Sequence, residues 1–302
     1  MTESLGRIGR VAVTELASAV RSRRALVVTL LFVVVAAFVM YGTISAFAAL
    51  EREVLSGLGL PGSDAPGSVT TALWKSKPFL RTIDRIVGDS LVFADIRGRH
   101  PVALAYAMFL FQVVPLLTLL VSAPRVAEDL RSGAARYWLV RVSRNEWSLG
   151  KFVGEAMLLA CAMLVGCLAA WTIVLARLPG MAGVGVLPEL VDWTLRAWVY
   201  AFGWLGLFLG VSHISRSGGK ATALAILALL GVVAWGPCLR ACVPESGPFV
   251  CLTQLECLAP SSAQVALWRR QAGPLFLGLV HLTAVSLFYL SLGAAVFRRR
   301  DV

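Results

Sequence analysis

Six long apolar stretches constrain this chain more than any other feature of its sequence. A helix needs about 20 apolar residues, each rising about 1.5 Å, to cross about 30 Å of hydrocarbon. The stretches that meet or approach this length are residues 25–50, 101–123, 152–178, 193–215, 221–239 and 275–297. Hydrophobic residues make up 58% of the chain and charged residues 15%, which excludes an ordinary soluble enzyme and a disordered chain. We predict an all-α integral membrane protein with six transmembrane helices in one domain, residues 1–302.

Charged residues are nearly absent from these stretches. Glu155, Arg177 and Arg196 are the charged residues inside them, and each lies within four residues of a stretch end. A charge at the bilayer centre costs about 2.5–3.5 kcal/mol on insertion scales, so this distribution suits lipid. The first stretch is too long for a cleavable signal peptide, although Ala46-Phe47-Ala48 resembles a cleavage site. We interpret it as an uncleaved signal-anchor helix.

The distribution of basic residues predicts the orientation. With the N-terminus inside, the inner side carries 16 basic and 7 acidic residues, a net charge of +9. The outer side carries 12 basic and 10 acidic residues, a net charge of +2. Because inner loops of membrane proteins are enriched in Lys and Arg, we predict that both termini lie inside. The overall charge of +11 therefore indicates orientation and lipid headgroup contact. A nucleic-acid partner is not expected, since no soluble basic face is interleaved with aromatic residues.

The segments between the stretches differ in character. In residues 1–24, one face at helical spacing predicts an amphipathic helix in the inner membrane interface, or simply a basic leader; this face comprises Leu5, Ile8, Ala12, Leu16 and Ala19. Residues 51–100 form a predicted outer loop without a ligand motif. Residues 240–274 form the last predicted outer loop, in which 251–258 and 263–268 could be re-entrant half-helices packed against protein.

The predicted inner segment 124–151 is the most informative part of the chain. Val126, Leu130, Ala134 and Trp138 recur every four residues, which predicts a short amphipathic helix, and acidic residues at its start suit the helix dipole. Gly133 allows a close backbone approach or a break. In residues 193–215, the Gly-x-x-x-Gly spacing of Gly206 and Gly210 weakly favours close helix packing.

Three stretches of the sequence together resemble the membrane subunit of an ABC-2 type transporter. They are the basic entry to the first span, residues 14–24; the inner sequences 128–133, 142–144 and 150–152; and the basic tail, residues 297–301. Arg141 departs from the family pattern, which often has proline before Val-Ser-Arg. The long segment after the first span is similar to the branch that serves gliding motility or copper-enzyme maturation.

The resemblance implies a permease subunit of an ABC exporter in the bacterial cytoplasmic (inner) membrane, without catalytic residues or a cofactor of its own. In that family, the inner segment is a coupling helix that docks on a separate ATP-binding subunit. Two ATPase copies, which bind ATP and Mg²⁺, would serve two permease chains, as a homodimer or a heterodimer. The coupling residues that the resemblance implies are Glu128, Asp129, Gly133, Arg144, Gly150 and Lys151.

The sequence itself contains no ATP-binding loop. A P-loop ends in Gly-Lys-Ser or Gly-Lys-Thr, whereas Gly219-Lys220 is followed by Ala221 and Gly150-Lys151 by Phe152. The spans carry no dedicated charged site, which leans towards an amphipathic or lipid-like cargo or a mechanical role.

Other polar residues have simpler interpretations. We expect Glu155 to pair with Lys151 one helical turn away, and His213 and His281 to make packing hydrogen bonds rather than a metal site. Four cysteines fall at or in the last predicted outer loop and could form disulfides in an oxidising periplasm; they are Cys238, Cys242, Cys251 and Cys257. Two alternatives to transport follow: a membrane thiol oxidoreductase that uses these cysteines, or a structural membrane anchor.

Overall fold

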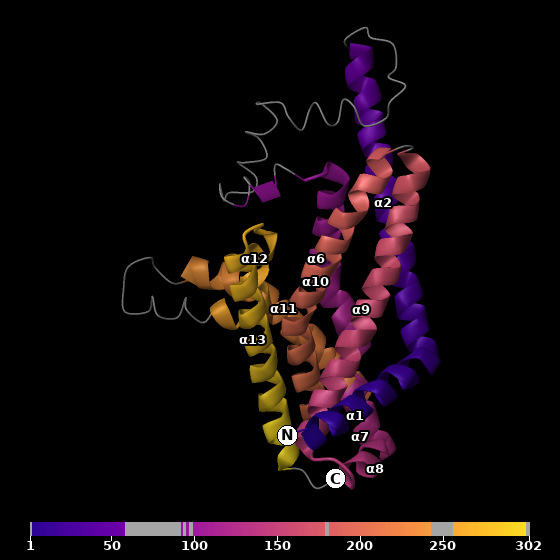
Figure 1. Ribbon diagram of the computed structural model, residues 1–302. Coiled ribbons are helices and arrows are strands. Elements are labelled where there is room, and N and C mark those ends of the chain that lie inside the picture. Colours follow the sequence, from indigo (N-terminus) through magenta and orange to yellow (C-terminus); the bar gives the residue numbers. More distant parts are fainter. Residues whose placement is uncertain are drawn as a thin grey trace.

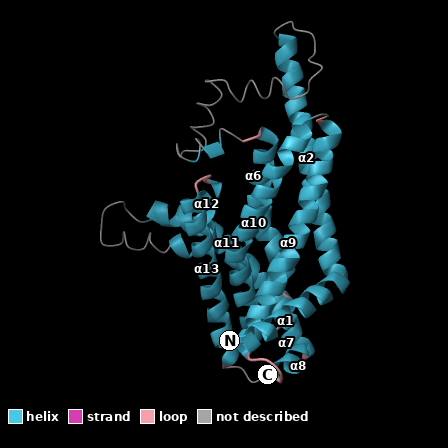
Figure 2. Ribbon diagram, in the orientation of Figure 1, coloured by secondary structure: helices cyan, strands magenta, loops and turns pink. Residues whose placement is uncertain are grey.

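The computed structural model describes residues 2–57, 92, 95–96, 99–178, 181–242 and 256–299, and these ranges are almost entirely helical (Figure 1; Figure 2). The long helices are α2 (Arg23–Gly57), α6 (Pro101–Ser122), α9 (Arg144–Arg177), α10 (Met181–Ile214), α11 (Gly218–Cys242) and α13 (Ala272–Arg298). Each of these six is long and apolar enough to cross a membrane, so every predicted apolar stretch corresponds, in the same order, to a helix that could span it.

Shorter helices complete the described part of the chain. They are α1 (Thr2–Arg21), α7 (Arg125–Ser132), α8 (Ala134–Leu139), the 3-10 helix η2 (Pro260–Ala263) and α12 (Gln264–Trp268). Figure 1 shows α1, α7 and α8 together at the end of the bundle where α13 also finishes. The last-loop stretch 263–268 is thus helical, while residues 251–255 lie outside the described residues, and the re-entrant arrangement stays a prediction.

Several of the long helices extend beyond the apolar stretches from which we predicted them. Helix α9 begins at Arg144 instead of residue 152, and α10 begins at Met181 instead of residue 193. Apolar composition marks where lipid can surround a helix, whereas caps and tertiary contacts decide where the helix starts. The chain therefore continues as helix through several polar turns at the bundle ends.

Helix α10 forms the centre of the bundle. In its most apolar 18-residue window 72% of the residues are buried, against 17% for α11, and it packs against α6, α9 and α13. Gly206 and Gly210 of α10 lie directly against the backbone of α13. A Cβ on Gly206 would lie 2.3 Å from the backbone oxygen of Ser286, and a Cβ on Gly293 would lie 2.5 Å from the oxygen of Gly210. The close packing expected of Gly206 and Gly210 is confirmed, and neither helix can move closer.

Helix α1 crosses the end of the bundle and packs along α9. Ala12 and Ala19 of the predicted apolar face are buried, but Leu5 is exposed. The predicted apolar face therefore serves largely as protein core, because a helix and a membrane interface select the same residue types. Val13 and Val20, with Leu5, form a second apolar stripe that is exposed in the single chain. The interfacial position of α1 stays a prediction.

Candidate functional site

The segment between α6 and α9 forms two short helices that meet at a glycine. Helix α7 ends and α8 begins at Gly133, whose φ of 78° and ψ of 0° lie in the left-handed region. Glycine adopts this region without the steric cost of a Cβ. The possible break at Gly133 is thus confirmed, but the single continuous helix is wrong. Because the chain turns there, Ala135 is buried in place of the predicted Ala134, which is exposed.

The start of α9 is fixed by a capping box. The backbone N–H of Glu146 donates to Ser143 Oγ at 3.3 Å, and the backbone N–H of Ser143 donates to Glu146 Oε2 at 2.9 Å. These two bonds satisfy donors that a helix N-terminus otherwise leaves free. The chain turns just before this cap without the proline of the family pattern, since the backbone N–H groups of Arg141 and Val142 both donate to Trp138 O.

Five charged side chains from three helices meet beneath this segment. The Lys151 ammonium contacts Glu15 of α1 and Asp129 of α7, and its side chain is only 4% exposed. One turn further along α9, Glu155 is fully buried and pairs with Arg125 of α7, whose Nε lies 3.1 Å from Glu155 Oε1. We call these residues the inner ion cluster. The predicted pair of Lys151 with Glu155 is wrong, because Lys151 reaches across to α1 and α7 instead.

Two glycines of α9 allow α1 to approach this cluster. A Cβ on Gly150 would lie 2.5 Å from Val11 Cβ, and a Cβ on Gly154 would lie 3.0 Å from the backbone oxygen of Ala12. Gly150 and Gly154 thus form a small-residue groove of the Gly-x-x-x-Gly kind, in which backbones approach closely. Gly150, which the family pattern suggested for coupling, is buried and holds α1 against α9.

Two more of the predicted coupling residues bind other helices. Glu128 Oε1 lies 3.3 Å from Arg24 Nη1 at the start of α2, and both side chains are about half exposed. Arg144 Nη1 donates to the backbone oxygens of Phe297 and Arg298 at 2.8 and 2.9 Å. A cation at these carbonyls suits the negative end of α13. Most residues that the sequence suggested therefore fasten the segment to the bundle.

The side of this segment that faces away from the bundle carries different residues. Val140 is 87% exposed and Tyr137 is 58% exposed. The Arg141 guanidinium lies 4.3 Å from the centroid of the Tyr137 ring, and its Nη1 donates to the Tyr137 hydroxyl at 2.6 Å. Arg136 is also exposed. We call Arg136, Tyr137, Val140 and Arg141 the α8 surface.

Sequence reasoning missed the α8 surface and two members of the ion cluster. Tyr137, Val140 and Arg141 recur at helical spacing, beside the face of the predicted Trp138. This spacing could have predicted that the three residues share one exposed face. Glu15 and Arg125 gave no such signal. Glu15 meets Lys151 across 136 positions of the chain, and only the packing of α1 on α9 brings them together.

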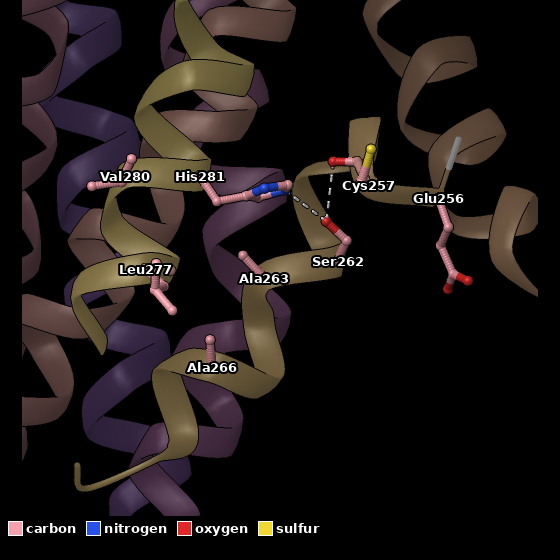
Figure 3. Close-up of a pocket in the computed structure, with 9 residues that line it drawn as sticks. Glu256, Cys257, Ser262, Ala263, Ala266, Leu277, Val280 and His281 are labelled. Carbon is pink, nitrogen blue, oxygen red and sulfur yellow. Dashed lines mark hydrogen bonds between the residues drawn. The ribbon is translucent and has the colours of Figure 1, made fainter. Parts of the chain in front are cut away.

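A pocket of about 660 Å³ lies near the other end of α13. Figure 3 shows His281 of α13 pointing to Ser262 of η2, with His281 Nε2 3.1 Å from Ser262 Oγ. His213 makes comparable contacts, to Ser148 Oγ at 2.8 Å and to Leu209 O at 2.7 Å. Both histidines therefore make the packing hydrogen bonds that we expected. Among the described residues there is no group of His, Cys, Asp or Glu that could hold a metal ion.

Cys257 lines this pocket as an exposed free thiol. Of the other cysteines proposed to form disulfides, the side chains of Cys238 and Cys242 and the whole of Cys251 lie outside the described residues. The disulfides thus stay a prediction. Nearby, Arg196 holds the end of α12, since its Nη1 donates to the backbone oxygens of Leu267 and Arg269 at 2.8 and 2.6 Å.

Comparison with known proteins gives one family match. The model of a family described as ABC-2 family transporter protein matches residues 10–302, nearly the whole chain. Among curated proteins there is no match. The matched range begins inside α1 and contains the six long helices, the inner ion cluster and the α8 surface.

Proposed function

The chain belongs to the ABC-2 family of transporter proteins, and from this membership we propose that it is the permease subunit of an ABC exporter. A separate ATP-binding subunit, present in two copies, binds ATP and Mg²⁺ and works with two permease chains. The complex lies in the bacterial cytoplasmic membrane, with both termini of this chain on the side of the ATPase. The long segment 51–100 supports the branch that serves gliding motility or copper-enzyme maturation.

The observation that supports this function best is the contrast between the two sides of the inner segment. Towards the bundle, its side chains are bound to α1, α2, α9 and α13. Away from the bundle, the α8 surface presents an aliphatic and an aromatic side chain with two arginines. A protein partner that covers Val140 and Tyr137 removes apolar area from water, and its acidic groups can meet the arginines.

This arrangement gives the ATPase a mechanical connection to the spans. A force on the α8 surface acts on α7 through Gly133, and α7 is joined to α1 and α9 through buried charges. ATP drives transport only if the ATPase binds one arrangement of the bundle better than another. The α8 surface supplies the contacts that can differ between these arrangements. For the cargo, the apolar spans support an amphipathic or lipid-like molecule.

The test uses the chain co-expressed with the ATP-binding subunit proposed as its partner. Arg141→Glu reverses a charge on the α8 surface, and Arg10→Glu reverses an exposed charge on α1 as the matched control. We expect Arg141→Glu to weaken ATPase binding at least about tenfold, which corresponds to about 1.4 kcal/mol, and to abolish stimulated ATP hydrolysis. Arg10→Glu keeps both. Equal loss in the two variants, or in neither, contradicts the assignment of the α8 surface.

A second variant tests the connection rather than the contact. Gly133→Val places a β-branched residue at a φ of 78°, so the α7–α8 turn must change. We expect membrane insertion and ATPase binding to persist while stimulation of hydrolysis is lost. Full stimulation in Gly133→Val shows that motion does not pass through this turn.

A further inference from the structure

The inner ion cluster does not balance its charge. It contains three carboxyl groups, from Glu15, Asp129 and Glu155, and two cations, Lys151 and Arg125. If every group is ionised, the cluster carries one net negative charge. Four of its five side chains are at most 17% exposed, and Asp129 is 29% exposed. An uncompensated charge in such surroundings is costly, so a fully ionised cluster is unfavourable.

Three charged or titratable groups on the surrounding helices have partners of their own. Arg24 of α2 pairs with Glu128 of α7, and Arg7 of α1 pairs with Glu3 and Glu146. On α10, His213 contacts Ser148 through Nε2 and Leu209 O through Nδ1. Trp147 lies between His213 and the cluster, since its ring contacts both His213 and the Lys151 ammonium. None of these groups supplies the missing positive charge.

A proton fits this site better than a metal ion. The described residues contain no arrangement of carboxylates that could hold a metal, and in the cluster the Lys151 and Arg125 nitrogens lie against the carboxylates. One proton makes the cluster neutral without any rearrangement.

The three carboxyl groups are not equivalent hosts for that proton. Glu15 and Asp129 both contact the Lys151 ammonium, and Asp129 is partly reached by water. Glu155 is fully buried, and the ion pair described for it joins its Oε1 to Arg125. Its Oε2 has no hydrogen-bond partner. Burial disfavours the charged form of a carboxyl group, most strongly where hydrogen bonds to it are missing.

We propose that the inner ion cluster is a proton-binding site and that Glu155 carries the proton while α7 is docked on α1 and α9. When α7 moves away, water reaches the carboxyl group, which then loses its proton to solvent. Docking of α7 therefore takes up one proton, and lower pH favours the docked arrangement. The proposal concerns this chain alone and does not depend on its role as an exporter.

Infrared spectroscopy of the purified chain in detergent tests this directly, because a protonated carboxyl group absorbs apart from an ionised one. We expect a protonated carboxyl band at neutral pH that is lost in Glu155→Gln. The band persists in Glu53→Gln, which changes an exposed carboxyl group on α2. Glu155→Asp keeps a protonated carboxyl group and shifts the band. Wild-type protein without the band, or Glu155→Gln with it, overturns the proposal.

A second measurement covers the case in which the glutamine variant folds poorly. In the wild type, native Glu155 holds a proton that an unfolded glutamate, with a pKa of about 4.3, has lost at neutral pH. This group therefore makes stability fall as pH rises above about 4.3, for as long as native Glu155 keeps its proton. We expect the unfolding midpoint of the wild type to fall over this range, a similar fall in Glu155→Asp, which keeps a protonated carboxyl group, and a smaller fall in Glu155→Gln. Equal pH dependence in all three proteins, or a midpoint that depends on sodium and not on pH, refutes the proton site.

Discussion

Replacing Lys151 by methionine separates two roles that this residue could have. Family resemblance suggested that Lys151 belongs to the coupling contact, whereas the structure places its ammonium between Glu15 and Asp129 with a side chain 4% exposed. Methionine matches the aliphatic stem of lysine but leaves these carboxylates without their cation. Removing one partner of a buried ion pair costs about 3–5 kcal/mol. Against a stability of about 5–15 kcal/mol for a typical domain, that loss is large.

The assay is equilibrium unfolding of the purified chain in mixed micelles, without any ATPase present. Arg141→Met is the matched control, because it removes a cation from the exposed α8 surface. We expect Lys151→Met to lower the free energy of unfolding by about 3–5 kcal/mol and Arg141→Met to leave it unchanged within error. Adding Glu15→Gln to Lys151→Met recovers about 1–3 kcal/mol, since neighbours in one network are not additive.

Two results would refute the reasoning. If Lys151→Met unfolds like the wild type and loses only ATPase binding, then Lys151 contacts the partner and the buried position assigned to it is wrong. If Glu15→Gln brings no recovery, the two residues do not act as a pair.

Two further predictions concern helix packing and pH. Gly206→Ala should destabilise the bundle by about 1–3 kcal/mol, because the added Cβ would lie 2.3 Å from the backbone of α13. Gly231→Ala places its Cβ in open space and should not destabilise the protein. The unfolding midpoints of the two variants test this difference. His100 caps α6 by accepting from Val102 N, and burial lowers its pKa below 6.5 against the opposing effect of Glu189. Stability should therefore rise with pH across the range just below 6.5, and His100→Asn, which keeps an acceptor, should remove that rise; equal slopes contradict it.

The architecture was predictable because lipid imposes a rule on each stretch separately. Every span must supply about 20 apolar residues, so six stretches give six helices regardless of how they pack. The break at Gly133 could be predicted for the same reason, since the backbone conformational freedom of glycine is a property of that one residue. The α1 face shows where such reasoning stops. Ala12 and Ala19 suit both a membrane interface and a neighbouring helix, and only the structure shows that they are buried.

The candidate site was harder to predict because its partners are distant in sequence. Spacing on one helix suggested Lys151 with Glu155, an interaction between neighbours on a helix surface. The structure instead joins Lys151 to residues on α1 and α7, because the glycines at 150 and 154 bring α1 within reach. A rule for neighbours on one helix cannot anticipate a competitor on another helix.

The basic residues of the inner segment, which contribute to the predicted orientation, differ in whether they are free to contact a partner. Six of them contribute to the excess of positive charge on the predicted inner side. Arg125, Arg144 and Lys151 are bound to carboxylates or helix-end carbonyls of the bundle. Arg131, Arg136 and Arg141 are exposed. The Lys151 side chain is only 4% exposed, so the exposed half of these residues is better placed to contact headgroups or an ATPase. Since α8 carries Arg136 and is followed at once by Arg141, charge reversal there is a sharper test of coupling than any change at Lys151.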